Sequence, residues 1–112
     1  MTPETQRQEA LARANEVRIK NSVWKTENTA LSSAEGLQRL IDVLTDPREP
    51  HDRLQIGQAL LSVRRLGVTK AAPILKHASV LSGDRKIGEL TFRQRQVIVH
   101  DLTMLRRRWL DK

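Results

Sequence analysis

Residues 56–96, IGQALLSVRRLGVTKAAPILKHASVLSGDRKIGELTFRQRQ, decide the predicted fold of this chain. Their pattern predicts two short helices joined by a tight basic turn, then a basic loop and a long helix. The apolar run that reaches Val63 is interrupted by RRLGV at positions 64–68. A glycine just past such a run usually ends a helix, because glycine enters the left-handed region without steric cost. We therefore expect Gly67 to end the first helix.

The second short helix is expected to begin at a cap provided by Thr69. Pro73 is acceptable in that helix only within the first turn, where its missing N–H costs little. The predicted apolar face comprises Ala71, Ala72, Ile74, Leu75 and Ala78. Two helices with cations at the turn between them can hold a phosphate, so this turn is the leading candidate for a binding site. Its candidate residues are Arg64, Arg65, Gly67, Thr69 and Lys70.

The N-terminal part of the chain predicts a long helix. Thr2, Pro3 and Glu4 are typical of a helix start, and strong helix formers continue to about Lys25. Positions 26–33, TENTALSS, predict a short connection. The helix has a thin stripe at helical spacing: Ala10, Ala14, Val17, Asn21 and Trp24, with Leu11 beside it. Such a helix packs along one neighbour or meets a partner.

The cations of this helix have two interpretations. Arg13, Arg18, Lys20 and Lys25 could contact phosphate, or they could be paired with Glu9, Glu16 or Glu27. Sequence alone favours neither.

A second helix is predicted from Ser32 or Ser33, with an apolar face of Leu37, Leu40, Ile41 and Leu44. Positions 46–52, DPREPHD, then break the chain, because two prolines and three acidic residues do not continue a helix. This break separates an N-terminal helical pair, 1–46, from a basic unit, 53–112. We expect both parts to belong to one domain, since neither has an apolar face large enough to be stable alone.

The loop after the central helices carries a second pair of cations. Ile87 and Leu90 are expected to anchor it on the core while Arg85 and Lys86 point outward. The motif TFRQ at 91–94 is a capping box, so the last helix begins there. Its core stripe is predicted to be Ile98, Leu102, Leu105 and Trp109. Arg93 and Arg95 lie near the helix N-terminus, where the helix dipole already attracts an anion.

The predicted fold is therefore all-α, with about five helices. With 3% aromatic residues, the core is expected to use Leu, Ile, Val and Ala, with Trp24, Phe92 and Trp109 as its large side chains. The adjacent Arg106, Arg107 and Arg108 complement the dipole at the C-terminal end of the last helix. That is a sufficient structural explanation for them.

Positive charge is concentrated in one half of the chain. Residues 1–50 hold 7 Lys and Arg against 8 Asp and Glu, a net of −1, and residues 51–112 hold 13 against 5, a net of +8; the two add to the total of +7. Concentrated basic charge is expected for a protein with a polyanionic partner. A basic surface that serves solubility is the alternative.

Other classes of protein find little support in the sequence. The chain has no cysteine, and its three histidines, His51, His77 and His100, lack metal-ligand spacing, so we expect no metal, no cofactor and no enzymatic activity. His77 borders an apolar stripe and is expected to be partly buried. We expect neither a membrane span nor a small-molecule substrate, and a cytoplasmic location.

The order of these motifs resembles the actinobacterial integration host factor family. The similar features, over residues 10–105, are ALL at 59–61, the glycine-containing basic turn, the paired cations of the following loop, and LTFRQR at 90–95. Residues 16–21, EVRIKN, are also similar to the basic segment of that family's long helix. The resemblance implies a long N-terminal helix followed by a helix-two-turns-helix unit, a unit also found in a small-subunit ribosomal protein and some DNA glycosylases.

In that family the unit binds and bends duplex DNA with little sequence preference. By position, the resemblance implies DNA contacts from Arg64, Arg65, Gly67, Thr69, Lys70, Arg85, Lys86, Gln94 and Arg95. The chain departs from the pattern at two places. The family's Gly-x-Gly-Lys turn is Gly67-Val68-Thr69-Lys70 here, and a further arginine after the paired ones is replaced by Gly88. A diverged, phage-encoded relative is as compatible with these changes as a host chromosomal protein.

The leading hypothesis is therefore a sequence-tolerant, architectural duplex DNA-binding protein of the nucleoid, acting in compaction or recombination. Its two cation clusters, one at the turn around Arg64 and one at Arg85 and Lys86, are expected to share one face. The alternatives are a protein-interaction module that uses the N-terminal helix and an RNA- or ribosome-associated protein.

Overall fold

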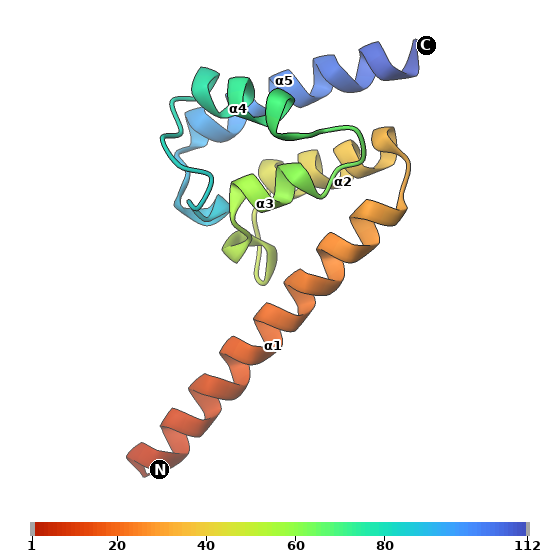
Figure 1. The fold of residues 1–112 in the computed structure, drawn as a ribbon. Coiled ribbons are helices and arrows are strands. Elements are labelled where there is room, and N and C mark those ends of the chain that lie inside the picture. Colours follow the sequence, from red (N-terminus) through yellow and green to blue (C-terminus); the bar gives the residue numbers. More distant parts are fainter. Residues whose placement is uncertain (1, 112) are drawn as a thin grey trace.

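The structure, a computed structural model, describes residues 2–111, and it confirms the all-α prediction (Figure 1). The α-helices are α1 (Pro3–Ala30), α2 (Ser33–Thr45), α3 (Ile56–Leu61), α4 (Val68–His77) and α5 (Phe92–Leu110). Two single 3₁₀ turns, η1 (His51–Arg53) and η2 (Ile87–Glu89), precede α3 and α5. Over these residues no β-strand forms, and one isolated antiparallel bridge joins Gln55 to Lys86.

Helix α1 starts as predicted, with the Thr2 side chain accepting a hydrogen bond from the amide of Thr5. The connection predicted at 26–33 is present but shorter, because α1 continues through Ala30 and α2 begins at Ser33. Two of its polar side chains bond back to the helix: the Thr26 hydroxyl donates to the Ser22 carbonyl at 3.1 Å, and the Thr29 hydroxyl donates to the Thr26 carbonyl at 2.7 Å. Asn28, fully buried, extends the packed stripe by one more turn.

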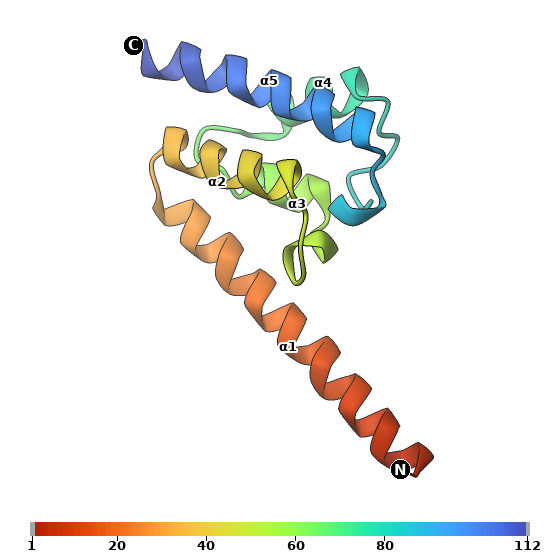
Figure 2. The same cartoon turned by 180° about the vertical axis from the view of Figure 1, so that it is seen from behind.

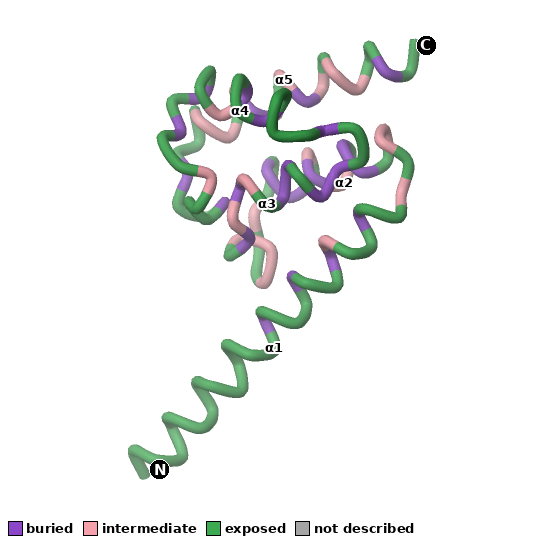
Figure 3. Tube along the Cα trace, in the orientation of Figure 1, coloured by how far each residue is buried: buried purple, intermediate pink, exposed green. Residues whose placement is uncertain are grey.

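The N-terminal half of α1 projects from the rest of the molecule (Figures 1 and 3). Residues 3–16 are all exposed, so Ala10 and Ala14 of the predicted stripe do not pack on a neighbour. The buried positions of this helix are Val17, Asn21, Trp24 and Asn28. The projecting half extends the longest dimension of the molecule to 58 Å, against 29 and 22 Å for the other two.

The core lies mainly between α2 and α5, which run side by side (Figure 2). Leu37, Leu40 and Leu44 of α2 are buried as predicted, as are Ile98, Leu102 and Trp109 of α5. Ile41 and Leu105 are partly buried at its margin, and Trp24 joins the core from α1. The predicted burial of Phe92 is wrong: this side chain is 63% exposed. Phe92 lies about 120° around the helix from Ile98, so it is off the core stripe and lines a surface hollow with Leu44 and Thr45 instead.

Local signals place the starts of α2 and α5 correctly. The Ser32 side chain caps α2 through the amide of Glu35. Thr91 and Gln94 form the predicted capping box at the start of α5. The chain break at 46–52 also holds, since no α-helix is present between α2 and α3.

Pro73 is the sixth residue of α4, so it lies beyond the first turn in which it was predicted. Its ring leaves the Thr69 carbonyl without the usual amide donor. Both residues are exposed, so water can hydrate that carbonyl.

Among the described helices, none combines the length and apolar character needed to cross a bilayer.

Candidate nucleic-acid interface

Two consecutive turns separate α3 from α4. The Val63 amide donates to the Leu60 carbonyl at 3.1 Å, and the Leu66 amide donates to the Val63 carbonyl, also at 3.1 Å. Val63 and Leu66 are both buried, whereas Arg64 and Arg65 between them are exposed. The two apolar anchors therefore present both cations to solvent. The arrangement is a helix, two turns and a second helix.

The left-handed residue of this connection is Arg65, with φ 73°, and not Gly67. Gly67 has extended backbone, with φ −87° and ψ −177°, so the prediction that it ends α3 as a left-handed residue is wrong. The left-handed residue therefore lies in the second turn, two residues before the glycine. Left-handed backbone in a residue with a Cβ costs about 1 kcal/mol or more.

Gly67 is instead the N-cap of α4, so the prediction that Thr69 caps this helix is also wrong. The Ala71 amide donates to the Gly67 carbonyl at 2.9 Å, which is the first hydrogen bond of the α4 backbone ladder. No side chain within residues 2–111 caps α4, and its first turn contains no acidic residue. The amides of Val68 and Thr69 therefore lie at an exposed, positively polarised helix end, which is a site suited to an anion.

Trp109 brings together cations from both sides of this turn. The Arg65 guanidinium lies 4.9 Å from the centroid of the indole, and the Lys70 ammonium lies 5.0 Å from it. Cation–π contacts of this kind favour one orientation of each side chain. Arg108 of α5 lines the same shallow hollow as Thr69 and Lys70. We call this the turn surface, and its members are Arg64, Arg65, Gly67, Thr69, Lys70 and Arg108.

Arg106 and Arg108, near the end of α5, have different surroundings. The Arg106 Nε donates to the Ala34 carbonyl of α2 at 3.2 Å, a contact that is separate from the dipole role expected for it. Arg108 belongs to the turn surface, which sequence spacing did not reveal because α4 and α5 meet through tertiary packing.

The loop that carries Arg85 and Lys86 is fastened to the start of α3. The Ile56 amide donates to the Arg85 carbonyl at 2.9 Å, and the Gly57 amide donates to the Gly83 carbonyl at 2.8 Å. The two glycine backbones approach so closely that a Cβ on Gly57 would lie 3.0 Å from Gly83. The loop is also anchored by buried Ile87 and Leu90, as predicted, and both of its cations are exposed.

Lys86 faces α1 and not the α3–α4 turn. It lines a hollow of about 440 Å³ between α1 and the segment 53–58. Three other cations line this hollow: Arg18 and Lys25 from α1, and Arg53 from η1. We call it the basic groove, and its cations are Arg18, Lys25, Arg53 and Lys86. The structure thus associates Lys70 with Arg108 and Lys86 with Arg18, so the two predicted clusters have different neighbours.

Arg53 was not anticipated from the sequence. It follows a break rich in acidic residues and precedes a core leucine, so nothing in its local sequence marks it as part of a site. Its relation to Lys86 depends on the bridge between Gln55 and Lys86. A contact between segments some 30 residues apart leaves no pattern in the sequence that could predict it.

Arg93 and Arg95, the remaining candidates, have different environments. Arg93 is exposed in the first turn of α5. Arg95 is partly buried: its Nη1 donates to the Leu44 carbonyl at 2.9 Å, and its guanidinium lies 5.7 Å from the centroid of the Phe92 ring. Leu44 lies in the last turn of α2, which contains no basic residue of its own. Arg95 thus stabilises the C-terminal end of α2.

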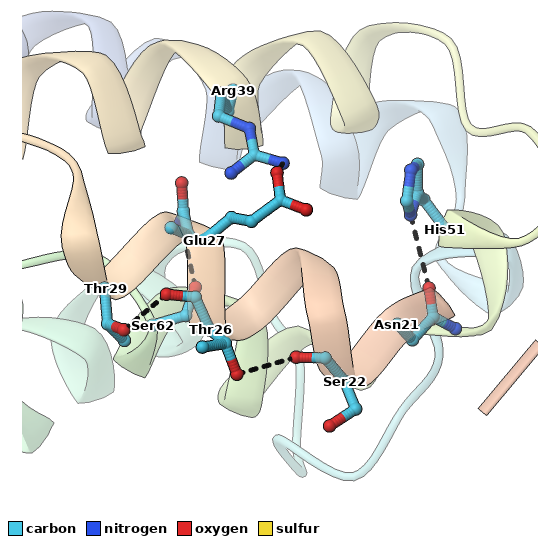
Figure 4. Close-up of polar contacts among 9 residues, drawn as sticks. Asn21, Ser22, Thr26, Glu27, Thr29, Arg39, His51 and Ser62 are labelled. Atoms are coloured by element: carbon cyan, nitrogen blue, oxygen red, sulfur yellow. Dashed lines mark hydrogen bonds and ion pairs between the residues drawn. The ribbon is translucent and has the colours of Figure 1, made fainter. Parts of the chain in front are cut away.

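Hydrogen bonds of Asn21 and Asn28 hold the C-terminal half of α1 against the rest of the molecule (Figure 4). The Asn21 side-chain amide donates to the Pro50 carbonyl at 2.9 Å, and its oxygen lies 3.2 Å from the His51 Nδ1. Burial lowers the pKa of His51 below its ordinary value, and the nearby Arg39 cation lowers it further. The Asn28 side-chain amide donates to the Ser62 hydroxyl at 2.9 Å. These contacts set the position of Arg18 and Lys25 relative to the rest of the groove.

Titratable residues elsewhere form ordinary surface pairs. Glu16 and Lys20 pair at 2.8 Å on α1, which lowers the pKa of the carboxyl and raises the pKa of the amine. His77 is not partly buried as predicted but exposed, with its Nδ1 2.8 Å from the Asp101 carboxylate. Within residues 2–111, no group of three or more His, Asp and Glu side chains is placed to hold a metal ion.

No protein-family model, curated protein or solved structure matches this chain.

The two surfaces share one electrostatic property. Within the described residues, none of the cations of the turn surface or the basic groove forms an ion pair with a carboxylate. The groove lining includes four cations and no acidic residue. The hollow beside Lys70 and Arg108 also includes Asp101, which pairs with His77. Cations that form no ion pair within the protein attract anions.

Proposed function

We propose that this protein is a non-enzymatic, largely sequence-tolerant DNA-binding protein that contacts the phosphates of duplex DNA. The observation that carries the proposal is the turn surface. Arg65 and Lys70 lie over Trp109 and flank the uncapped start of α4. Backbone amides at a helix N-terminus with two positioned cations match the needs of a phosphate group.

The binding mechanism follows from the chemistry of these groups. A phosphate oxygen would accept hydrogen bonds from the Val68 and Thr69 amides, while Arg65 and Lys70 would contribute charge. Neutralising phosphates releases condensed counterions, which drives binding without reading bases. Bending the duplex would bring further phosphates to the protein, so an architectural role in compaction or recombination fits this mechanism.

The proposal includes a relationship to the actinobacterial integration host factor family. What supports it is the two hydrogen-bonded turns between α3 and α4, which agree with a helix-two-turns-helix unit. A location on the nucleoid is part of the same proposal.

A protein-interaction module is the second candidate. Ile19 and Val23 on α1 are 55% and 49% exposed, and they line a shallow recess beside Trp24 and Pro50. An exposed apolar strip on a projecting helix is suited to a protein partner. Salt-insensitive pulldown of a single protein would favour this function over DNA binding.

A gel-shift experiment separates these possibilities. The full chain is titrated against duplex DNA, single-stranded DNA and RNA of equal length at two salt concentrations. We expect the duplex to bind most tightly, with affinity that falls at the higher salt. Preference for RNA would support the ribosome-associated alternative, and absence of duplex binding at low salt would refute the proposal.

A further inference from the structure

Three cations of α1 share one flank of the helix. At about 100° per residue, Arg7, Arg18 and Lys25 lie within about 20° of one another around the helix axis. The opposite side carries mixed charge, roughly 120–180° away: Glu9, Glu16 and Glu27 together with Arg13 and Lys20. Arg18 and Lys25 line the basic groove, whereas Glu27 lines the recess beside Trp24. The groove therefore lies on the flank that carries the three cations.

Neutralisation differs between the two flanks. On the opposite flank, Glu16 pairs with Lys20 at 2.8 Å, and Glu27 pairs with Arg39 at 3.7 Å. On the groove flank, Lys25 and Arg18 interact with uncharged groups: Lys25 Nζ donates to the Gln58 Oε1 at 2.8 Å, and Arg18 donates to the Asn15 oxygen. The chain therefore leaves charge available on the flank that faces the groove.

The groove is a formed feature and not a chance gathering of mobile side chains. One wall is α1, held by Asn21 to the Pro50 carbonyl. The other wall contains Arg53 and Lys86, which are brought together by the bridge from Gln55 and by the Ile87 amide donating to the Leu54 carbonyl at 2.9 Å.

The line of cations is longer than a single phosphate requires. From Arg7 to Lys25 is 18 residues, or about 27 Å along the helix. Arg7 lies on the projecting half of α1, beyond the residues that line the groove. One strand of duplex DNA carries a phosphate about every 3.4 Å of axis, so an extended backbone could meet several of these cations.

We propose that the basic groove and the flank of α1 that continues it bind the sugar-phosphate backbone of one strand of duplex DNA. This surface is a second contact, separate from the turn surface, and it gives the projecting half of α1 a role in binding. The inference rests on the proposed function, because it takes duplex DNA as the partner.

The test compares double variants that each remove two positive charges from exposed positions. The groove variant is Arg18→Ala with Arg53→Ala. The matched control is Lys20→Ala with Arg48→Ala, whose side chains are already paired with Glu16 and Asp46. A third variant, Arg65→Ala with Lys70→Ala, reports on the turn surface. Binding of the full chain to a duplex is measured by fluorescence anisotropy over a range of salt, and circular dichroism checks the helix content of each variant.

We expect the groove variant to bind about tenfold more weakly than wild type or worse, since two charge-assisted contacts are lost. Its log–log salt slope should become shallower by about 1.8, which is 0.9 for each phosphate contact. The matched control should keep the wild-type slope. Equal losses in the groove variant and the control would overturn the inference, and so would an unchanged groove variant beside a weakened turn variant. Failure of the wild-type chain to bind duplex DNA would instead refute the proposed function itself.

Discussion

At the scale of single residues, Trp109 has two roles. Its indole is buried at the end of the α5 core stripe, and its face orients Arg65 and Lys70. We expect Trp109→Ala to lower the free energy of unfolding by about 3 kcal/mol, because a large buried side chain is lost. Chemical denaturation measures this change, and Trp109→Phe should be milder.

The emission of Trp109 provides an independent check on its burial. In a Trp24→Phe background the remaining tryptophan should emit at blue-shifted wavelengths in the native state. Red emission typical of an exposed indole would show that the end of α5 is not packed as described.

His51 makes the stability depend on pH. Burial and the Arg39 cation lower the pKa of His51 in the folded state, so the unfolded chain binds a proton more readily. Its contribution is fully present above a pH of about 6.5, the ordinary value for histidine, and is lost as the pH falls below it. We expect urea unfolding to show lower stability at pH 5 than at pH 7, and His51→Gln to reduce this difference. An equal pH effect in wild type and variant would contradict the assignment to His51.

At the scale of elements, substitutions of Gly67 at the start of α4 should change stability and DNA affinity in different ways. A Cβ added to Gly67 would have no neighbour within 4 Å, so Gly67→Ala should leave DNA affinity nearly unchanged. Its effect on stability should be small, because alanine is a poorer N-cap than glycine but restricts the unfolded chain more. Gly67→Asp should raise stability by about 0.5 kcal/mol, since its carboxylate caps the free amides. It should also weaken DNA binding, because the carboxylate occupies the position proposed for a phosphate.

The control for added negative charge is Gln8→Glu, on the side of α1 away from the body. If Gly67→Asp and Gln8→Glu weaken DNA binding equally, the start of α4 is not a phosphate site. Thermal unfolding of the same proteins tests the expected gain in stability.

Sequence patterns predicted the elements whose signals are local. The Thr91–Gln94 capping box and the α5 stripe depend on residues three or four positions apart, and both are present. The end of α1 was missed because burial of Asn28 against Ser62 overrides the polar composition of that segment. The role of Arg95 was missed for a similar reason: its partner, the Leu44 carbonyl, lies 51 residues away in the sequence. Tertiary contacts of this kind have no spacing that a sequence can show.

At the scale of the whole molecule, the net charge of each half of the sequence did not predict which cations lie together. The second half holds the excess of positive charge, yet Arg18 and Lys25 in the basic groove come from the first half. The fold places these cations beside Arg53 and Lys86, on the flank of α1 opposite Glu9, Glu16 and Glu27. The net charge of each half therefore does not show where the fold gathers its cations.

We propose that these cations neutralise DNA phosphates, and the salt dependence of duplex binding by the full chain tests this directly. With about 4–6 phosphate contacts, a plot of log affinity against log salt concentration should have a slope of about −4 to −5. Fluorescence anisotropy with a labelled duplex at a series of salt concentrations gives this slope. A slope near zero would contradict phosphate neutralisation, because binding without counterion release does not depend on neutralised phosphates.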